Sequence, residues 1–152
     1  MAVLQIKSID DPDLWLRLDI PAVNDENGVF TFHGFGAKIE VACSFEGVCL
    51  RRFLDQLSEI YAKLDGTAWL VSDDHTVAIR FAAGDLGRGR FVVGGNVSLI
   101  GVLDYAESGA PKEPCLDMEY PGAEFNFDGI VTEQTYIPGY QAVLMELLKE
   151  AP

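Results

Sequence analysis

The sequence predicts an α+β fold: one curved antiparallel β-sheet of about eight to ten strands, with two amphipathic helices packed on it. Short segments of alternating apolar and polar residues are separated by turn-like stretches rich in glycine and aspartate. Such short links favour antiparallel neighbours, because a parallel pair of strands needs a long crossover. Two longer segments instead repeat apolar residues at the spacing of one helix face. The 152 residues are expected to form a single domain, 1–152.

The first part of the chain is predicted to consist of strands. The alternation is clearest in LWLRLDI, where four apolar residues at every second position share one face of the strand. The stretch NDENG, residues 24–28, has the composition of a turn. The expected strands are residues 2–9, 14–20, 29–36 and 37–45.

Residues 48–64 form the clearest predicted helix. Apolar residues that include Phe53 and Leu57 recur three and four positions apart, and charged residues occupy the opposite face. Gly66 stands where a helix C-terminal glycine is expected. The strands predicted to follow are residues 67–72, 76–82, 89–95, 97–105, 115–120 and 123–129. Turns are expected at 73–75, 84–87 and 94–96.

The last helix is predicted over residues 136–149, with Leu144 and Leu147 on its apolar face. The stretch TEQTYIP leads into it. The Thr135 hydroxyl can cap the helix, and a proline in the first turn costs no hydrogen bond. Tyr136 and Ile137 are expected to pin the helix start onto the sheet. This stretch is therefore interpreted as a structural joint and not as a catalytic site.

No motif in the chain carries recognisable catalytic or metal-binding chemistry. His33 and His75 lack partner ligands at metal-binding spacing, and Cys43, Cys49 and Cys115 form no CxxC pattern. Cysteines among large apolar residues are typical of buried thiols. The sequence therefore predicts no catalytic residue, no metal and no cofactor.

The net charge of −13 is the most unusual property of the chain. Such a protein repels nucleic acid and anionic membranes and attracts basic partners. With no leader-like segment and no long apolar run, a cytoplasmic location is expected. The acidic residues are concentrated in the second half, where the sequence predicts a surface that binds a basic protein partner. The residues expected to form that surface are Asp104, Glu107, Glu113, Asp117, Glu119 and Glu124.

Three motifs carry a resemblance to a known family. They are RRFLDQLSEIYAKLDG followed directly by TAWLVS, the strand pair GRGRFVVGGNV, and a strand with an F-x-F pattern followed by EQTYIP and the last helix. In this order the chain resembles the WapI-type bacterial immunity protein family over roughly residues 28–150. The resemblance implies a non-enzymatic protein that neutralises a cognate toxin domain. The interface residues of such proteins vary, so none is carried over.

Two other functions stay open at the level of the sequence. The first is a small-ligand-binding protein or an enzyme that uses the concave face of the sheet. The second is a housekeeping interaction module.

Overall fold

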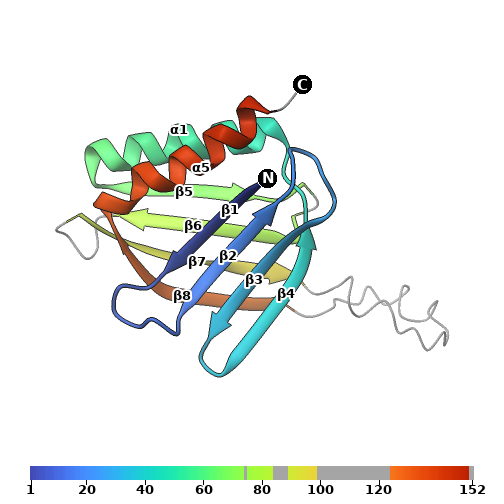
Figure 1. Cartoon of the computed structure of the whole chain (residues 1–152). Coiled ribbons are helices and arrows are strands. Elements are labelled where there is room, and N and C mark those ends of the chain that lie inside the picture. The colour runs from blue at the N-terminus through green and yellow to red at the C-terminus, as the bar shows by residue number, and fades with distance from the viewer. Residues whose placement is uncertain (74, 84–88, 99–123, 151–152) are drawn as a thin grey trace.

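The computed structural model of the chain describes residues 1–73, 75–83, 89–98 and 124–150. Within these residues it contains two four-stranded antiparallel sheets and two α-helices (Figure 1). The first sheet consists of β1 (Ala2–Lys7), β2 (Trp15–Ile20), β3 (Gly28–Gly34) and β4 (Ala37–Cys43). The second consists of β5 (Gly66–Val71), β6 (Val77–Ala83), β7 (Arg90–Ser98) and β8 (Glu124–Glu133). Helix α1 (Gly47–Lys63) connects the sheets, and the 3₁₀ turn η1 (Gln134–Tyr136) leads into α5 (Ile137–Lys149).

The α+β class, the antiparallel pairing and the two packed helices are confirmed, but the prediction of a single sheet is wrong. In each sheet the strands lie in chain order and every neighbouring pair is antiparallel, as the short links predicted. Helix α1 interrupts this order. It carries the chain away from β4, so that β5 begins a second sheet. The sheets meet where the Ile9 N–H donates to the Val131 carbonyl over 2.9 Å.

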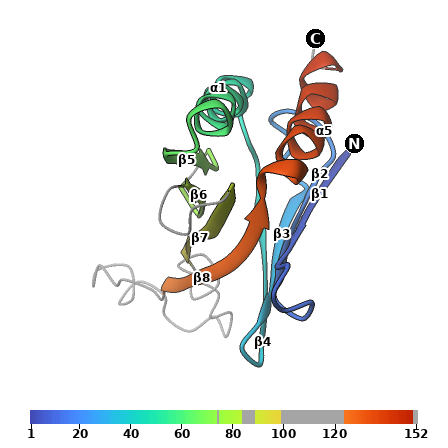
Figure 2. The ribbon, with the colours of Figure 1, turned by 90° about the vertical axis from the view of Figure 1, so that its left-hand side faces the viewer.

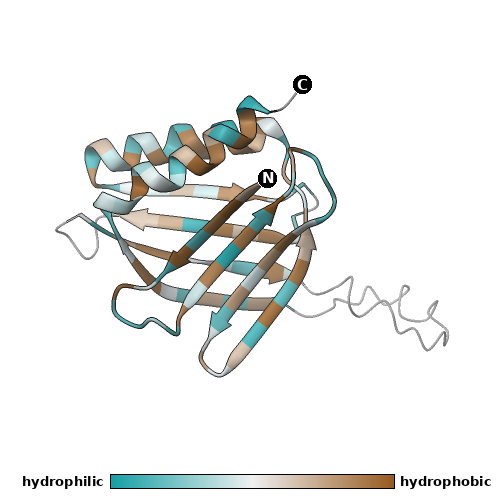
Figure 3. Cartoon of the chain, viewed as in Figure 1, coloured by the Kyte–Doolittle hydropathy of each residue, from teal (hydrophilic) through white to brown (hydrophobic). Residues whose placement is uncertain are grey.

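The core lies between the two sheets, which face each other in Figure 2. Phe30 and Phe32 of β3 are fully buried. The Phe127 ring of β8 lies 5.8 Å from the Phe30 ring and 5.0 Å from the Phe32 ring. Apolar and polar residues alternate along several strands in Figure 3, and the inward set is buried. This packing of aromatic rings across the sheets supplies much of the apolar burial that stabilises the fold.

The helices cover the side of the molecule on which the edge strands β1 and β5 lie (Figures 1 and 2). Phe53 of α1 is fully buried, and its ring lies 5.5 Å from that of Phe81 on β6. The Gln56 side chain accepts a hydrogen bond of 2.8 Å from the backbone N–H of Trp69, on the outer edge of β5. Helix α1 therefore both extends the core and satisfies an edge donor that strand pairing leaves open.

The helix boundaries agree closely with the prediction, but two glycine assignments are wrong. Leu64, and not Gly66, takes the left-handed conformation that ends α1, with φ of 55°. Gly66 opens β5 with φ of 103°. The second error is at residues 94–96, which lie inside β7 and not in a turn. There the pairing with β8 shifts between Val93 and Gly95, because a bulge lets β7 continue past its glycines.

The stretch TEQTYIP is a joint between β8 and α5, as predicted, but its details differ. Thr135 lies in η1, and α5 has no side-chain cap. Ile137 is fully buried and fixes the helix start, whereas Tyr136 is 52% exposed. The Gln134 side chain donates to the Tyr61 carbonyl over 3.2 Å and so joins this turn to α1. The local pattern located the helix start, which is held by the burial of Ile137 and by this hydrogen bond and not by the expected side-chain cap.

The predicted strands at 97–105 and 115–120 lie wholly or mostly outside the described residues. The strand predicted at 123–129 is part of the longer β8. Neither helix in the described part of the chain combines the length and apolar character that a membrane crossing requires.

Candidate functional site

The acidic surface predicted from the sequence falls almost entirely outside the described residues. This applies to Asp104, Glu107, Glu113, Asp117 and Glu119. Glu124 is exposed at the start of β8, where it pairs in register with Ser98 of β7. Within the described residues its carboxylate has no hydrogen bond or ion pair. Glu124 is therefore exposed and unpaired as far as the described part of the chain shows.

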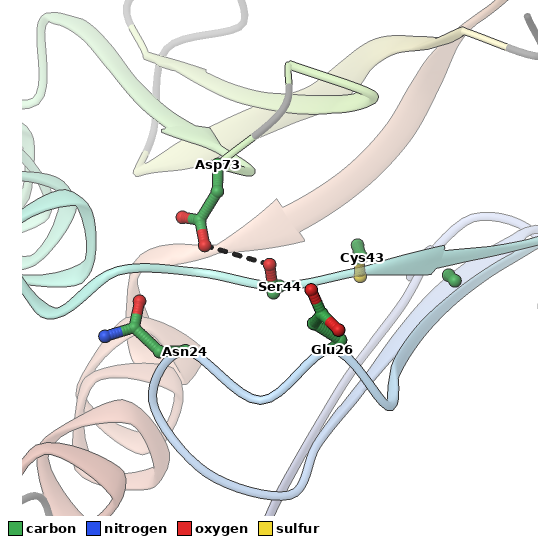
Figure 4. Close-up of a pocket in the computed structure, with 6 residues that line it drawn as sticks. Asn24, Glu26, Cys43, Ser44 and Asp73 are labelled. Carbon is green, nitrogen blue, oxygen red and sulfur yellow. Dashed lines mark hydrogen bonds between the residues drawn. The ribbon is translucent and has the colours of Figure 1, made fainter. Parts of the chain in front are cut away.

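A pocket of about 400 Å³ opens where the ends of the two sheets meet (Figure 4). Three segments form it: the loop between β2 and β3, the end of β4 with the residue after it, and the turn between β5 and β6. The described residues that line it are Asn24, Glu26, Ala42, Cys43, Ser44 and Asp73. This lining contains two carboxylates and no basic side chain.

Two hydrogen bonds between Ser44 and Asp73 hold the pocket together. The Asp73 N–H donates to the Ser44 carbonyl over 2.9 Å, and the Ser44 hydroxyl donates to Asp73 Oδ2 over 2.9 Å. They join the first sheet to the second. On the opposite wall, the Asn24 N–H donates to the Phe45 carbonyl over 2.9 Å, and Asn24 has a φ of 67°. Asparagine tolerates this left-handed conformation better than most residues, so the loop carries Glu26 toward the same opening.

The electrostatics of the pocket favour a cation. Asp73 Oδ1 is buried and has no hydrogen-bond partner within the described structure, and an unsatisfied buried carboxylate oxygen is costly. The Glu26 side chain is exposed and points toward Ser44 and Cys43 in Figure 4. Carboxylate, amide and hydroxyl oxygens are the acceptors that an ammonium or guanidinium group requires.

The described residues do not assemble a metal-binding set. No group of three or more histidine, cysteine or acidic side chains among them is arranged to hold a metal ion. His33 stacks on Trp15 on the outer face of the first sheet, with ring centroids 5.2 Å apart. His75 occupies the turn between β5 and β6, and neither histidine is among the described lining residues. Cys43 is buried, as expected, and Cys49 is partly exposed, whereas Cys115 lies outside the described residues.

Sequence reasoning did not identify the residues of this pocket as a site. Both NDENG and SDDHT have the composition of turns, and each does connect neighbouring strands. Their common feature is that each turn carries acidic residues. Only the contact between the sheets brings Glu26 and Asp73, which are 47 positions apart in the sequence, to one opening.

Searches with family models, among curated proteins and among solved structures found no match to the chain. The resemblance to the WapI-type immunity proteins therefore rests on the three sequence motifs alone.

Proposed function

We propose that this protein is a non-enzymatic binding protein that captures a basic protein partner, and that it acts as an immunity protein against a cognate bacterial toxin domain. The observation that carries the proposal is the pocket at the joint of the sheets, whose described lining holds the carboxylates of Glu26 and Asp73 without a cation. The chain as a whole carries a net charge of −13, which also favours a basic partner. The motif resemblance supplies the class of partner.

The pocket is suited to a single lysine or arginine side chain from the partner. Toxin domains that act on nucleic acid carry such side chains where phosphates bind. An acidic protein whose pocket binds one of those side chains blocks the same surface. Long-range attraction also speeds the encounter, and added salt slows it. The acidic residues predicted from the sequence to bind the partner, Glu124 and those between 104 and 119, are a second and separate part of the proposal.

The alternative of a small ligand on the concave side of a sheet is less well supported. The inward faces of the described strands are filled by buried side chains such as Phe30, Phe32 and Val93. The pocket is large enough for a small cationic ligand, since ligand sites commonly measure about 300–1,000 Å³. Such a ligand offers the same positive group as a lysine or arginine side chain.

Co-expression with the toxin domain encoded beside this gene tests the proposal. The intact protein is expected to restore growth and to co-purify with the toxin domain. Glu26→Lys is expected to weaken the complex by about tenfold, because it replaces an attraction by a repulsion. Glu59→Lys is the matched control: it makes the same charge change on an exposed site toward the far end of α1.

The same assay separates the pocket from the predicted acidic segment. Charge reversal of Asp117 with Glu119, and of Glu107 with Glu113, is expected to weaken binding without unfolding the protein. If the intact protein neither protects cells nor binds the toxin domain, immunity to that toxin is wrong. If all the reversals leave protection intact, the acidic residues do not form the interface.

A further inference from the structure

A groove of about 400 Å³ runs between α1 and α5 on the outside of the molecule. The two helices lie side by side in Figure 1 and run in opposite directions. The residues that meet across the groove agree with this direction. Arg51 near the start of α1 and Lys149 at the end of α5 line the groove together, and Gln141 near the start of α5 donates to the hydroxyl of Ser58 farther along α1 over 2.9 Å. That hydrogen bond ties the helices together.

The floor of the groove is apolar. Leu54 and Leu148 are partly buried and pack against the core, and Met145 is 51% exposed. An unbranched thioether adapts its shape to different neighbours, which makes methionine common at binding surfaces. The floor therefore presents apolar area that no described element of the chain covers.

The rim of the groove carries cations although the chain is strongly acidic. Arg51 on α1 and Lys149 on α5 are both exposed. Arg51 has no ion-pair partner within the described residues, and Lys149 has only a 3.4 Å contact with the exposed Glu146. Asp55 is the one carboxylate among the described lining residues. The groove thus combines an apolar floor with two cations at one end, which is opposite in sign to the pocket at the sheet joint.

We propose that this groove binds an amphipathic helix of a second partner protein, whose apolar stripe covers the floor and whose terminal carboxylate pairs with Arg51 and Lys149. Two antiparallel helices leave a groove into which a third helix packs its side-chain ridge. The cations favour an acidic end on that helix. This partner is distinct from the basic protein proposed above, and the groove does not depend on that proposal.

The test uses a fluorescein-labelled helical peptide of about 15 residues, with leucines at helical spacing and glutamates in its terminal turns. Saturable binding measured by fluorescence anisotropy is expected for the intact chain. The double variant Arg51→Glu and Lys149→Glu is expected to weaken binding by about tenfold, because two exposed charge pairs are reversed. The matched control is Arg52→Glu, which changes an exposed neighbour that does not line the groove. It is expected to have little effect.

A second pair of variants tests the apolar floor. Met145→Gln is expected to weaken peptide binding several-fold, whereas Val48→Gln, which changes a 53% exposed residue outside the groove, is not. Because all these side chains are exposed, thermal melts should show that each variant is folded. Chemical shifts of the intact chain on peptide addition should change along both α1 and α5.

Several outcomes would overturn the proposal. The first is that the intact chain binds no peptide at about 1 mM, a weak affinity for any specific contact. The second is that a peptide with lysines in place of the glutamates binds as tightly as the original peptide. The third is that Arg52→Glu weakens binding as much as the double variant does. Finally, if sedimentation shows a dimer of the chain that Met145→Gln dissociates, the groove is occupied by a second copy. In each arm, Glu26→Lys should leave peptide binding unchanged, which keeps this result separate from the toxin assay.

Discussion

Truncating Leu144 to alanine tests the assignment of the buried face of α5. The Leu144 side chain is fully buried, whereas that of the next residue, Met145, is 51% exposed. The substitution removes three buried carbons, which corresponds to about 2.4 kcal/mol at about 0.8 kcal/mol per methylene-sized group. The cavity left behind adds to this loss, so that a decrease of about 3–5 kcal/mol in the free energy of unfolding is expected. Alanine and leucine have similar helix propensities, so backbone effects contribute little.

Urea denaturation at 25 °C measures this change, with Met145→Ala as the matched control on the same helix. The control should change the free energy of unfolding by less than about 0.5 kcal/mol. The slope of the transition should stay the same in both variants, since the surface exposed on unfolding hardly changes. A loss below about 1 kcal/mol for Leu144→Ala, or equal losses for both variants, would refute the assignment of the buried face. Phe53, Leu57 and Leu147 are buried to the same degree and should show comparable losses of about 2–5 kcal/mol.

Two further predictions concern close packing and pH. Gly95→Ala should cost more than about 2 kcal/mol in a denaturant melt, because the new Cβ would overlap the Ala78 carbonyl oxygen. Gly139→Ala lies in the first turn of α5, where the new Cβ meets nothing within 4 Å, and it should stabilise the protein by up to about 1 kcal/mol. Equal effects of the two substitutions would contradict the pairing of β6 with β7. Burial raises the pKa of the Tyr140 phenol above its ordinary value of 10.0. The contribution of the neutral Tyr140 phenol to the free energy of unfolding is therefore complete below pH 10.0 and is lost as the pH rises through the higher folded-state pKa. Melts between about pH 9 and about pH 11 should therefore show a shallower loss for Tyr140→Phe than for the exposed control Tyr136→Phe, and identical slopes would show that Tyr140 does not cause the loss.

The sequence by itself determined the local elements of this protein. Both helices were located within about two residues because each repeats apolar side chains at the helical period over several turns. Phe53, Leu57 and Leu144 were assigned to the core on this basis and are buried. The strands up to β7 were found through their alternation and short links. These signals are carried by residues close together in the sequence, and so they need no knowledge of the rest of the fold.

The tertiary structure decided how these elements are assembled. Short links predict antiparallel neighbours within each run of strands. They do not show whether the strand after α1 joins the first sheet or begins a second one, and the structure has two sheets. Leu64 adopts a left-handed conformation that a local pattern assigns to glycine, and there its N–H donates to the Ile60 carbonyl over 2.8 Å.

The candidate site shows the same limit more strongly. Glu26 and Asp73 belong to separate turns, each of which has an ordinary turn composition. They line one pocket only because Ser44, at the end of one sheet, is hydrogen-bonded to Asp73 in a turn of the other. The groove between the helices likewise depends on α1 and α5 packing as antiparallel neighbours, which places Arg51 beside Lys149. Amphipathic patterns reveal which face of a helix is buried, but they do not reveal which helix lies next to it. The physical reason is that pairing between distant elements is decided by the packing free energy of the whole core, to which each local pattern contributes only a part.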